Sequence, residues 1–403
     1  YFALLCVTSH ERYYPTGKGV LVNEYWDRSL HFSRGSWYPL NKTPYTEVFS
    51  EQLPVATYLF ALPFVFMPKY DIEKTSGYFI ADSFPFADVN FPLIRPSLYK
   101  TIYMIIFSFF MAIFGLISLY LLLLLLKITG KNLNYALLFL LPTSLYFVFN
   151  RFDIFPALIS LLVLYSVYKE RYNLTVVLLA IGVMAKAYLL VCLPIYLVYY
   201  YNRHNKVNLN MVFLFVLTAF LVLLPLLIRG GVGALFVPFN FQLGRGANLE
   251  SLYFLISLFF PTIFLSYSGL INLVFLILSL SVIPFAVTAK ITSFKQLLKW
   301  SLLAILVFML FMKFYSPQWI IWVIFLLILN IESKSDMLKI ILFQVVTYLC
   351  FPIAFVFYGP SSIQFIILAA IRNIILMSFI VVLIRELFPS SNLYIYLRRF
   401  RLS

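Results

Sequence analysis

Charge, cysteine and histidine are all scarce in this chain, and each shortage argues against a class of protein. Only 11% of the 403 residues are charged, whereas soluble domains carry roughly 25%. The three cysteines, Cys6, Cys192 and Cys350, stand far apart without a CxxC spacing, which argues against a disulfide framework and a zinc site. The three histidines share no spacing typical of a metal site, and no glycine-rich phosphate loop or strand–helix nucleotide-binding pattern occurs. The sequence therefore assigns no metal and no nucleotide cofactor; a divalent metal requirement stays open.

Apolar sequence, by contrast, is abundant. Hydrophobic residues make up 63% of the chain, and the mean hydropathy is +0.95. Runs of about 20 apolar residues recur, each long enough to cross roughly 30 Å of hydrocarbon as a helix. We therefore predict an all-α, polytopic membrane protein of about 11 to 13 transmembrane helices, with residues 1–403 forming a single integral membrane domain in a lipid bilayer. The expected spans are 98–126, 135–149, 154–168, 174–185, 188–201, 210–228, 270–289, 300–312, 319–331, 338–356 and 363–384, after a partial first span at 1–8 whose beginning is missing.

The positions of the basic residues predict how the chain is oriented in the membrane. The net charge is +15, but no basic face or RNA-binding pattern is present, so nucleic acid is not an expected partner. The lysines and arginines lie between the predicted spans, and the positive-inside rule places the segments that carry them on the cytoplasmic side. They are 127–131, 169–171, 203–206, 290–299, 334–339 and 385–401.

The intervening turns are then extracytoplasmic. Residues 9–97 form a large extracytoplasmic loop, in which the apolar segment 54–67 is too short to span and is expected to be an interfacial helix. Residues 229–268 form a second external loop with a re-entrant or interfacial segment. The membrane is expected to be the plasma membrane, or the endoplasmic reticulum in a eukaryote.

Four short polar strings interrupt the apolar sequence, at 150–156, 186–188, 244–251 and 313–319. By the predicted topology all four lie on the external side. Charge at such positions is costly and therefore functional by default. Their basic residues Arg151, Lys186 and Arg245 run against the positive-inside rule, and a cluster of cations there suits an anionic lipid headgroup such as a lipid phosphate.

Structural alternatives stand beside each of these residues. Asp153 is three residues before Pro156 and is suited to cap the following helix. Lys186 is near a span end, where lysines commonly extend to the headgroups. Glu250 with Ser251, and Gln318 after Pro317, are placed to start helices.

Three strings in the large loop resemble a known family. They are Tyr25-Trp26-Asp27, the stretch from His31 to Pro39, and the stretch from Glu51 to Leu59. Together they resemble the first luminal loop of GT-C-type glycosyltransferases, most closely the polyprenyl-phosphate-mannose-dependent mannosyltransferases of glycosyltransferase family 87. The strings 151–158, 185–194, 245–252 and 315–322 resemble the same family in the same order. The chain departs from it at Gln52-Leu53-Pro54, where relatives carry Tyr-Pro-Pro or His-Pro-Pro.

The resemblance implies an inverting transfer of a sugar, mannose first, from a polyprenyl- or dolichyl-phosphate donor to a lipid- or glycan-linked acceptor on the extracytoplasmic face. Asp27 would be the catalytic base. In the alternative interpretation, Asp27 has a structural role and pairs with Arg28 or caps a helix. Such a displacement needs one base and no covalent intermediate. The expected phosphate-binding residues are Arg245, Lys186 and Arg151. The expected substrate-binding residues are Arg34, Glu51, Asp153, Glu250, Gln318 and Trp319.

Two rival functions remain. A transporter or flippase for an anionic lipid-linked saccharide would also place charges among its helices, although no internal repeat of the kind common in transporters occurs here. The acid-rich external loop favours an enzyme. A catalytically inactive subunit of a glycan assembly complex is the third possibility.

Overall fold

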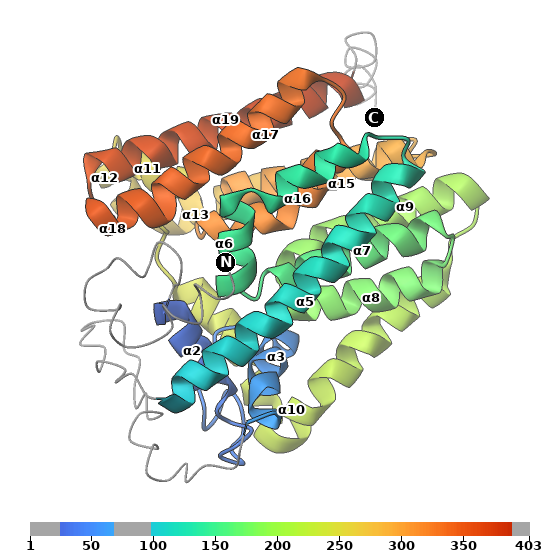
Figure 1. Ribbon diagram of the computed structural model, residues 1–403. Coiled ribbons are helices and arrows are strands. Elements are labelled where there is room, and N and C mark those ends of the chain that lie inside the picture. Colours follow the sequence, from blue (N-terminus) through green and yellow to red (C-terminus); the bar gives the residue numbers. More distant parts are fainter. Residues whose placement is uncertain (1–24, 68–97, 389–403) are drawn as a thin grey trace.

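The computed structural model describes residues 25–67 and 98–388; the remaining parts of the predicted loop 9–97 and of the basic tail lie outside the described residues. The described residues are helical, with no named strand among them, so the all-α prediction is confirmed. Figure 1 shows long helices side by side in one bundle. Its central and peripheral helices include α5 (Leu98–Ile128), α7 (Ile154–Tyr168), α8 (Tyr172–Ala185), α10 (Leu209–Gly244), α15 (Phe294–Phe311), α16 (Ile320–Leu329), α17 (Lys334–Tyr348) and α19 (Ile363–Leu387).

Shorter elements connect these helices. In chain order they are α2 (Tyr25–Gly35), α3 (Pro54–Val65), η4 (Leu133–Leu140), α6 (Pro142–Asn150), η5 (Ala187–Cys192), α9 (Leu193–His204), α11 (Leu252–Ser257), α12 (Pro261–Ser266), α13 (Ser268–Leu280), α14 (Val282–Thr288), η6 (Pro317–Trp319), η7 (Leu349–Ala354) and α18 (Phe355–Phe357).

By length and composition, six helices of the described part are suited to cross a membrane, or seven if the pair η4 and α6, bent by 61°, is one span. That number is below the 11 to 13 expected, which would need about 20 residues for every span, because several predicted spans form shorter helices. The 15 residues of α7 and the 14 of α8 would cover only about 22 Å at 1.5 Å per residue. These short helices pack inside the bundle beside the long ones.

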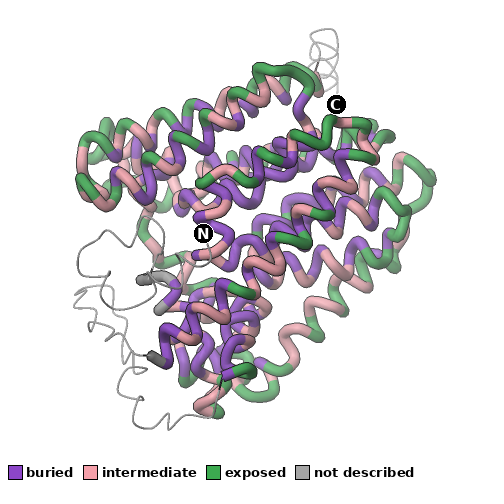
Figure 2. The backbone as a smooth tube through the Cα atoms, in the orientation of Figure 1, coloured by how far each residue is buried: buried purple, intermediate pink, exposed green. Residues whose placement is uncertain are grey.

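The core of the bundle lies around α16, in which every residue is buried. In α10, by contrast, only 11% of the most apolar window is buried, which leaves an apolar surface suited to lipid. Figure 2 shows this difference between the buried centre and the exposed periphery.

Ion pairs gather predicted cytoplasmic segments at one end of the bundle, the Glu332 end. Lys131 and Lys295 lie 3.2 and 2.8 Å from the Glu332 carboxylate, and Lys299 lies 2.8 Å from Glu386. Since α15 begins at this end and Lys313 follows it, the polar strings fall at the opposite end. The basic segments 127–131 and 290–299, predicted to share one side, therefore meet at one end of the bundle.

The segment expected to be an interfacial helix forms the helix α3, which packs against other parts of the protein. α3 begins with Pro54 in its first turn, and most of its residues are buried. Gly35, at the end of α2, lies so close that a Cβ there would collide with the Phe60 carbonyl oxygen. Tyr103 of α5 donates a 2.8 Å hydrogen bond to the same carbonyl. α2 and α3 therefore form a packed unit on α5.

Much of the segment predicted as an external loop at 229–268 is helical in the structure. α10 continues to Gly244 through a kink at Gly231, whose φ of +68° is in the left-handed region that glycine adopts freely. The span predicted at 210–228 ends just before this kink, and the chain resumes helical geometry after it. Residues 245–251, α11 and α12 follow in the rest of the predicted loop.

Candidate functional site

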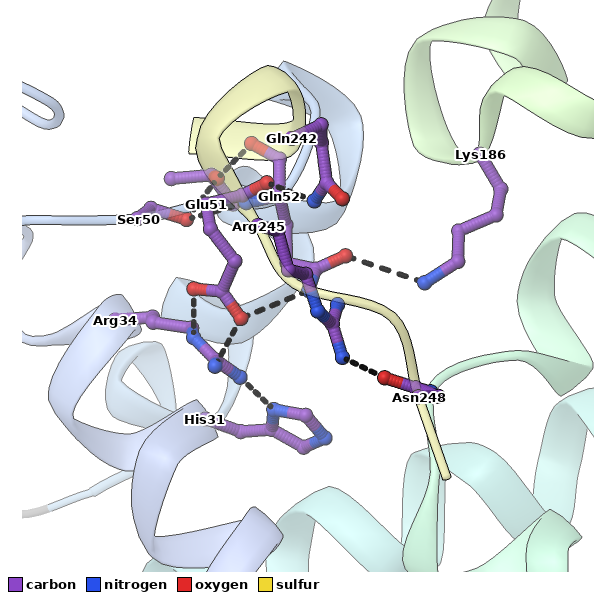
Figure 3. Close-up of polar contacts among 10 residues, drawn as sticks. His31, Arg34, Ser50, Glu51, Gln52, Lys186, Gln242, Arg245 and Asn248 are labelled. Carbon is purple, nitrogen blue, oxygen red and sulfur yellow. Dashed lines mark hydrogen bonds and ion pairs between the residues drawn. The ribbon is translucent and has the colours of Figure 1, made fainter. Parts of the chain in front are cut away.

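Polar residues from four distant segments meet at the end of the bundle opposite Glu332 (Figure 3). α2 supplies Arg34, and the turn before α3 supplies Glu51 and Gln52. Lys186 follows α8, and Arg245 follows α10. Three of the predicted site strings are thus brought together, and we refer to these five residues with Asp153 as the polar cluster.

Arg34 and Glu51 form the centre of the polar cluster. Arg34 Nε donates a 2.8 Å hydrogen bond to Glu51 Oε2, and Arg34 Nη2 pairs with the other carboxylate oxygen. Gln52 Nε2 donates a 3.0 Å bond to Glu51 Oε1. Burial raises the pKa of Glu51, but the Arg34 charge and the hydrogen bonds outweigh burial and hold it below its ordinary value. Glu51 is therefore a fixed carboxylate with little basicity.

Lys186 joins this centre to Asp153. Its Nζ donates a 3.2 Å hydrogen bond to Gln52 Oε1 and lies 3.9 Å from Asp153 Oδ1 and 4.3 Å from the Phe152 ring centre. Burial lowers the pKa of Lys186; Asp153 and Glu51 raise it, and Arg245 and Arg34 lower it further. Lys186 thus points into the protein. The alternative, in which this lysine extends to the lipid headgroups, does not describe its side chain.

Asp153 is buried and is bound by an aromatic side chain. Trp322 Nε1 donates a 2.7 Å hydrogen bond to Asp153 Oδ1. Asp153 stands at the N-cap position of α7, but its side chain makes no capping bond there. The capping alternative is therefore not the role that the structure gives its carboxylate.

A stack of three aromatic rings supports this pair. The Tyr188 ring lies 4.2 Å from Trp322 at an interplanar angle of 6°, and the Trp319 ring lies 4.0 Å from Trp322 at 20°. Trp319, expected to bind substrate, is only 7% exposed. It packs in the core and stacks on Trp322, whose indole N–H binds Asp153.

Arg245, in the segment that follows α10, completes the polar cluster (Figure 3). Its Nη2 donates a 3.1 Å hydrogen bond to Asn248 Oδ1, and its guanidinium lies 5.4 Å from the Phe314 ring centre. No carboxylate lies within ion-pair distance of Arg245 in the described part of the chain. Three cations, Arg34, Lys186 and Arg245, thus share two carboxylates, and the polar cluster carries a formal excess of positive charge.

His31 is a member of this region that sequence reasoning did not assign. Its Nδ1 lies 3.2 Å from Arg34 Nη1, a donor, and its ring stacks on Phe60 at 4.4 Å. Burial and the charges of Arg34, Lys186 and Arg28 lower its pKa, so His31 is neutral. Arg34 donates to Nδ1, which leaves the proton on Nε2. The position of His31 beside Arg34 could not be predicted from the spacing of residues in the sequence; it becomes visible only in the folded structure.

The remaining predicted residues lie at other positions. Arg151 is half-buried in the turn between α6 and α7. Gln318 accepts a 2.6 Å hydrogen bond from Ser316 Oγ at the start of η6. Glu250 pairs with Arg372 of α19 at 3.7 Å, outside the polar cluster. Asp27 falls in the first turn of α2, but its side chain lies outside the described part of the structure.

Two further observations concern the rest of the described structure. No group of three or more His, Cys, Asp or Glu side chains suited to a metal occurs among the described residues. A cavity of about 600 Å³ opens at the Glu332 end, against Lys169, Glu170 and Arg203, and no predicted site residue lines it.

These features define the class of the protein: it is an integral, polytopic, all-helical membrane protein whose partner is the lipid bilayer. Comparison with family models finds no match for the chain, and a search of curated proteins finds none that is similar to it. The functional argument therefore depends on the polar cluster itself.

Proposed function

We propose that the protein is an inverting glycosyltransferase that moves a sugar, mannose first, from a polyprenyl- or dolichyl-phosphate donor to a lipid- or glycan-linked acceptor on the extracytoplasmic face. The convergence of Arg34, Lys186 and Arg245 at one end of a membrane bundle supports this proposal. An excess of cations beside long apolar helices suits a ligand that joins a phosphate to a lipid tail.

In the proposed reaction, an acceptor oxygen attacks the anomeric carbon while the bond from that carbon to the phosphate oxygen breaks. Negative charge develops on the departing phosphate, and Lys186 and Arg245 would stabilise it by hydrogen bonds and charge. The acceptor hydroxyl proton would pass to Asp27. The bond formed and the bond broken involve the same carbon, so attack from the far side inverts it.

The pair formed by Arg34 and Glu51 is suited to hold the sugar. A carboxylate whose pKa is lowered by Arg34 is a poor proton acceptor. Its free lone pairs are good acceptors for sugar hydroxyl groups. This division of roles leaves the base to Asp27 and substrate binding to Glu51.

The proposal is tested by incubating protein in lipid nanodiscs with radiolabelled dolichyl-phosphate mannose and a glycolipid extract as acceptor. Wild type should form a labelled product, and Asp27→Asn should lose at least 100-fold in rate, since a general base contributes about 10²- to 10⁴-fold. Glu386→Gln, which alters an ion pair at the Glu332 end, is the matched control and should retain full rate. Full activity of Asp27→Asn would remove Asp27 from the mechanism.

The transporter or flippase remains the second candidate, favoured by one observation. Arg372 is a buried charge inside the membrane-length helix α19, and such residues mark translocation pathways in many transporters. The two candidates differ in covalent chemistry. Movement of intact labelled donor between leaflets of proteoliposomes, without product, would favour the transporter over the enzyme.

A further inference from the structure

The segment 245–251, which carries Arg245, is fixed to two other parts of the bundle. The Asn248 backbone N–H donates a 2.8 Å hydrogen bond to the Lys313 carbonyl, and Asn248 Nδ2 donates a 3.1 Å bond to the Phe314 carbonyl. Leu249 packs on a buried apolar cluster of η7 and α19, formed by Cys350, Ala354, Phe365 and Ala369. The segment is thus bound on one side to the turn after α15 and on the other to α19.

Arg372 and Asn373 of α19 hold the same segment through Glu250. Asn373 Nδ2 donates a 2.9 Å hydrogen bond to the Glu250 carbonyl. Arg372 Nη2 lies 3.5 Å from that carbonyl and 3.7 Å from Glu250 Oε2, and its guanidinium lies 4.3 Å from the Tyr315 ring centre. Arg372 therefore contacts segment 245–251 through Glu250 and also contacts Tyr315, in the turn that Asn248 binds.

A role in stability alone does not account for Arg372. Its side chain is fully buried, and its Nε and Nη1 have no hydrogen-bond partner among the described residues. Burial of a charge in such surroundings is costly, and an apolar side chain of similar size often stabilises a buried site as well or better. The arginine is best explained by the geometry that it imposes on Glu250.

We propose that Arg372 is a positioning residue for the anion site: it holds Glu250, which fixes segment 245–251, so that Asn248 keeps Arg245 directed into the polar cluster. Arg245 Nη2 donates its 3.1 Å hydrogen bond to Asn248 Oδ1, three residues along the same segment. Arg372 itself does not contact the anion. This inference rests on the proposed role of Arg245 in binding a lipid phosphate.

The first test measures the segment without any ligand. Hydrogen exchange in nanodiscs should be at least tenfold faster across 245–251 in Arg372→Met than in wild type, and Arg372→Lys should restore part of the protection. Glu386→Gln, in the same helix but at its other end, is the matched control and should leave this exchange unchanged. If Arg372→Met folds poorly, Arg372→Met combined with Glu250→Gln removes both charges and serves in its place. Unchanged exchange in these variants would overturn the inference.

The second test measures binding of farnesyl phosphate, with farnesol as the uncharged control. Arg372→Met should weaken phosphate binding by about 10- to 100-fold, the loss expected when a hydrogen bond to a charged group is removed, and should leave farnesol binding unchanged. In an Arg245→Ala background, Arg372→Met should have no further effect, which a general loss of stability would not produce. A weakening by Arg245→Ala but not by Arg372→Met would overturn the inference. Unchanged binding in both variants, with a loosened segment, would instead contradict the proposed phosphate role of Arg245.

Discussion

At the scale of single residues, the sequence readily shows where the unusual charged residues are, but it does not show which side chains they contact. Lys186 and Arg245 are conspicuous because charge is rare in apolar sequence, and the structure brings both to the polar cluster. The sequence gives no indication that Trp322 binds Asp153, because the two residues are 169 positions apart. Arg372 did carry a signal, as a charge within a predicted span, which marks a functional position by default.

Replacement of Arg245 tests the proposed phosphate contact. We expect Arg245→Ala to weaken binding of farnesyl phosphate by about 1.5–3 kcal/mol, the usual contribution of a hydrogen bond to a charged group. Lys295→Ala, a cation removed from the Glu332 end, is the control and should bind as wild type does. Equal affinity of the two variants, measured by titration calorimetry, would reassign Arg245 to a structural role.

The ion pair of Arg34 and Glu51 predicts how stability depends on pH. The pKa of Glu51 in the folded protein is below its ordinary 4.5, so its contribution is fully present above pH 4.5 and is lost as pH falls through the folded value. Thermal unfolding in detergent should therefore show Glu51→Gln less stable than wild type at pH 7, by about 1–3 kcal/mol. The difference should shrink in acid. A difference that stays constant from pH 7 to pH 3 would contradict the ionised pair.

At the scale of elements, the boundaries of simple helices were predictable and those of interrupted ones were not. The segment 154–168 was predicted as it is found in α7, since polar residues mark both of its ends. α10 was predicted to end at residue 228; Gly231, in a left-handed conformation, breaks the helical geometry just after this residue, and a second helical segment that was not predicted runs on to Gly244. The burial of α3 depends on its contacts with α2 and α5, which local sequence does not encode.

The contact between α2 and α3 is tested by adding a methyl group. Gly35→Ala should destabilise the protein by about 1–3 kcal/mol, the usual effect of overpacking, because the new Cβ would collide with the Phe60 backbone. Gly233→Ala in α10 is the matched control, since no atom lies within 4 Å of its added Cβ, and it should be neutral or slightly stabilising. Equal melting temperatures for the two variants would refute the close approach of α2 and α3.

At the scale of the whole molecule, the alternation of helices separates two kinds of charge. The Glu332 end holds cations that are paired with Glu332 and Glu386, whereas the polar cluster holds an excess of cations at the other end. The positive-inside rule predicted that the cations of the Glu332 end share one side, whereas those of the polar cluster run against the rule. The number of full spans was less predictable, because hydropathy alone does not show where a short helix is sheltered by its neighbours.

Cysteine labelling tests the predicted orientation. In a cysteine-free background, Gly246→Cys should react with a membrane-impermeant maleimide added outside intact cells, because segment 245–251 is predicted to be external. Ser335→Cys, in the exposed first turn of α17, should react only after the membrane is permeabilised. Labelling of both from the same side would contradict the topology on which the proposed function depends.

The kink in α10 has one more consequence. The 22 residues at 209–230, before the kink, rise about 33 Å as a helix, close to the roughly 30 Å of hydrocarbon that a bilayer provides. Mismatch with a thinner or thicker bilayer is relieved by tilting, and Gly231 joins this lipid-exposed part to the helical segment that ends beside Arg245. Acyl-chain length would thus act on the position of Arg245, and membranes of different thickness would tune the same protein differently.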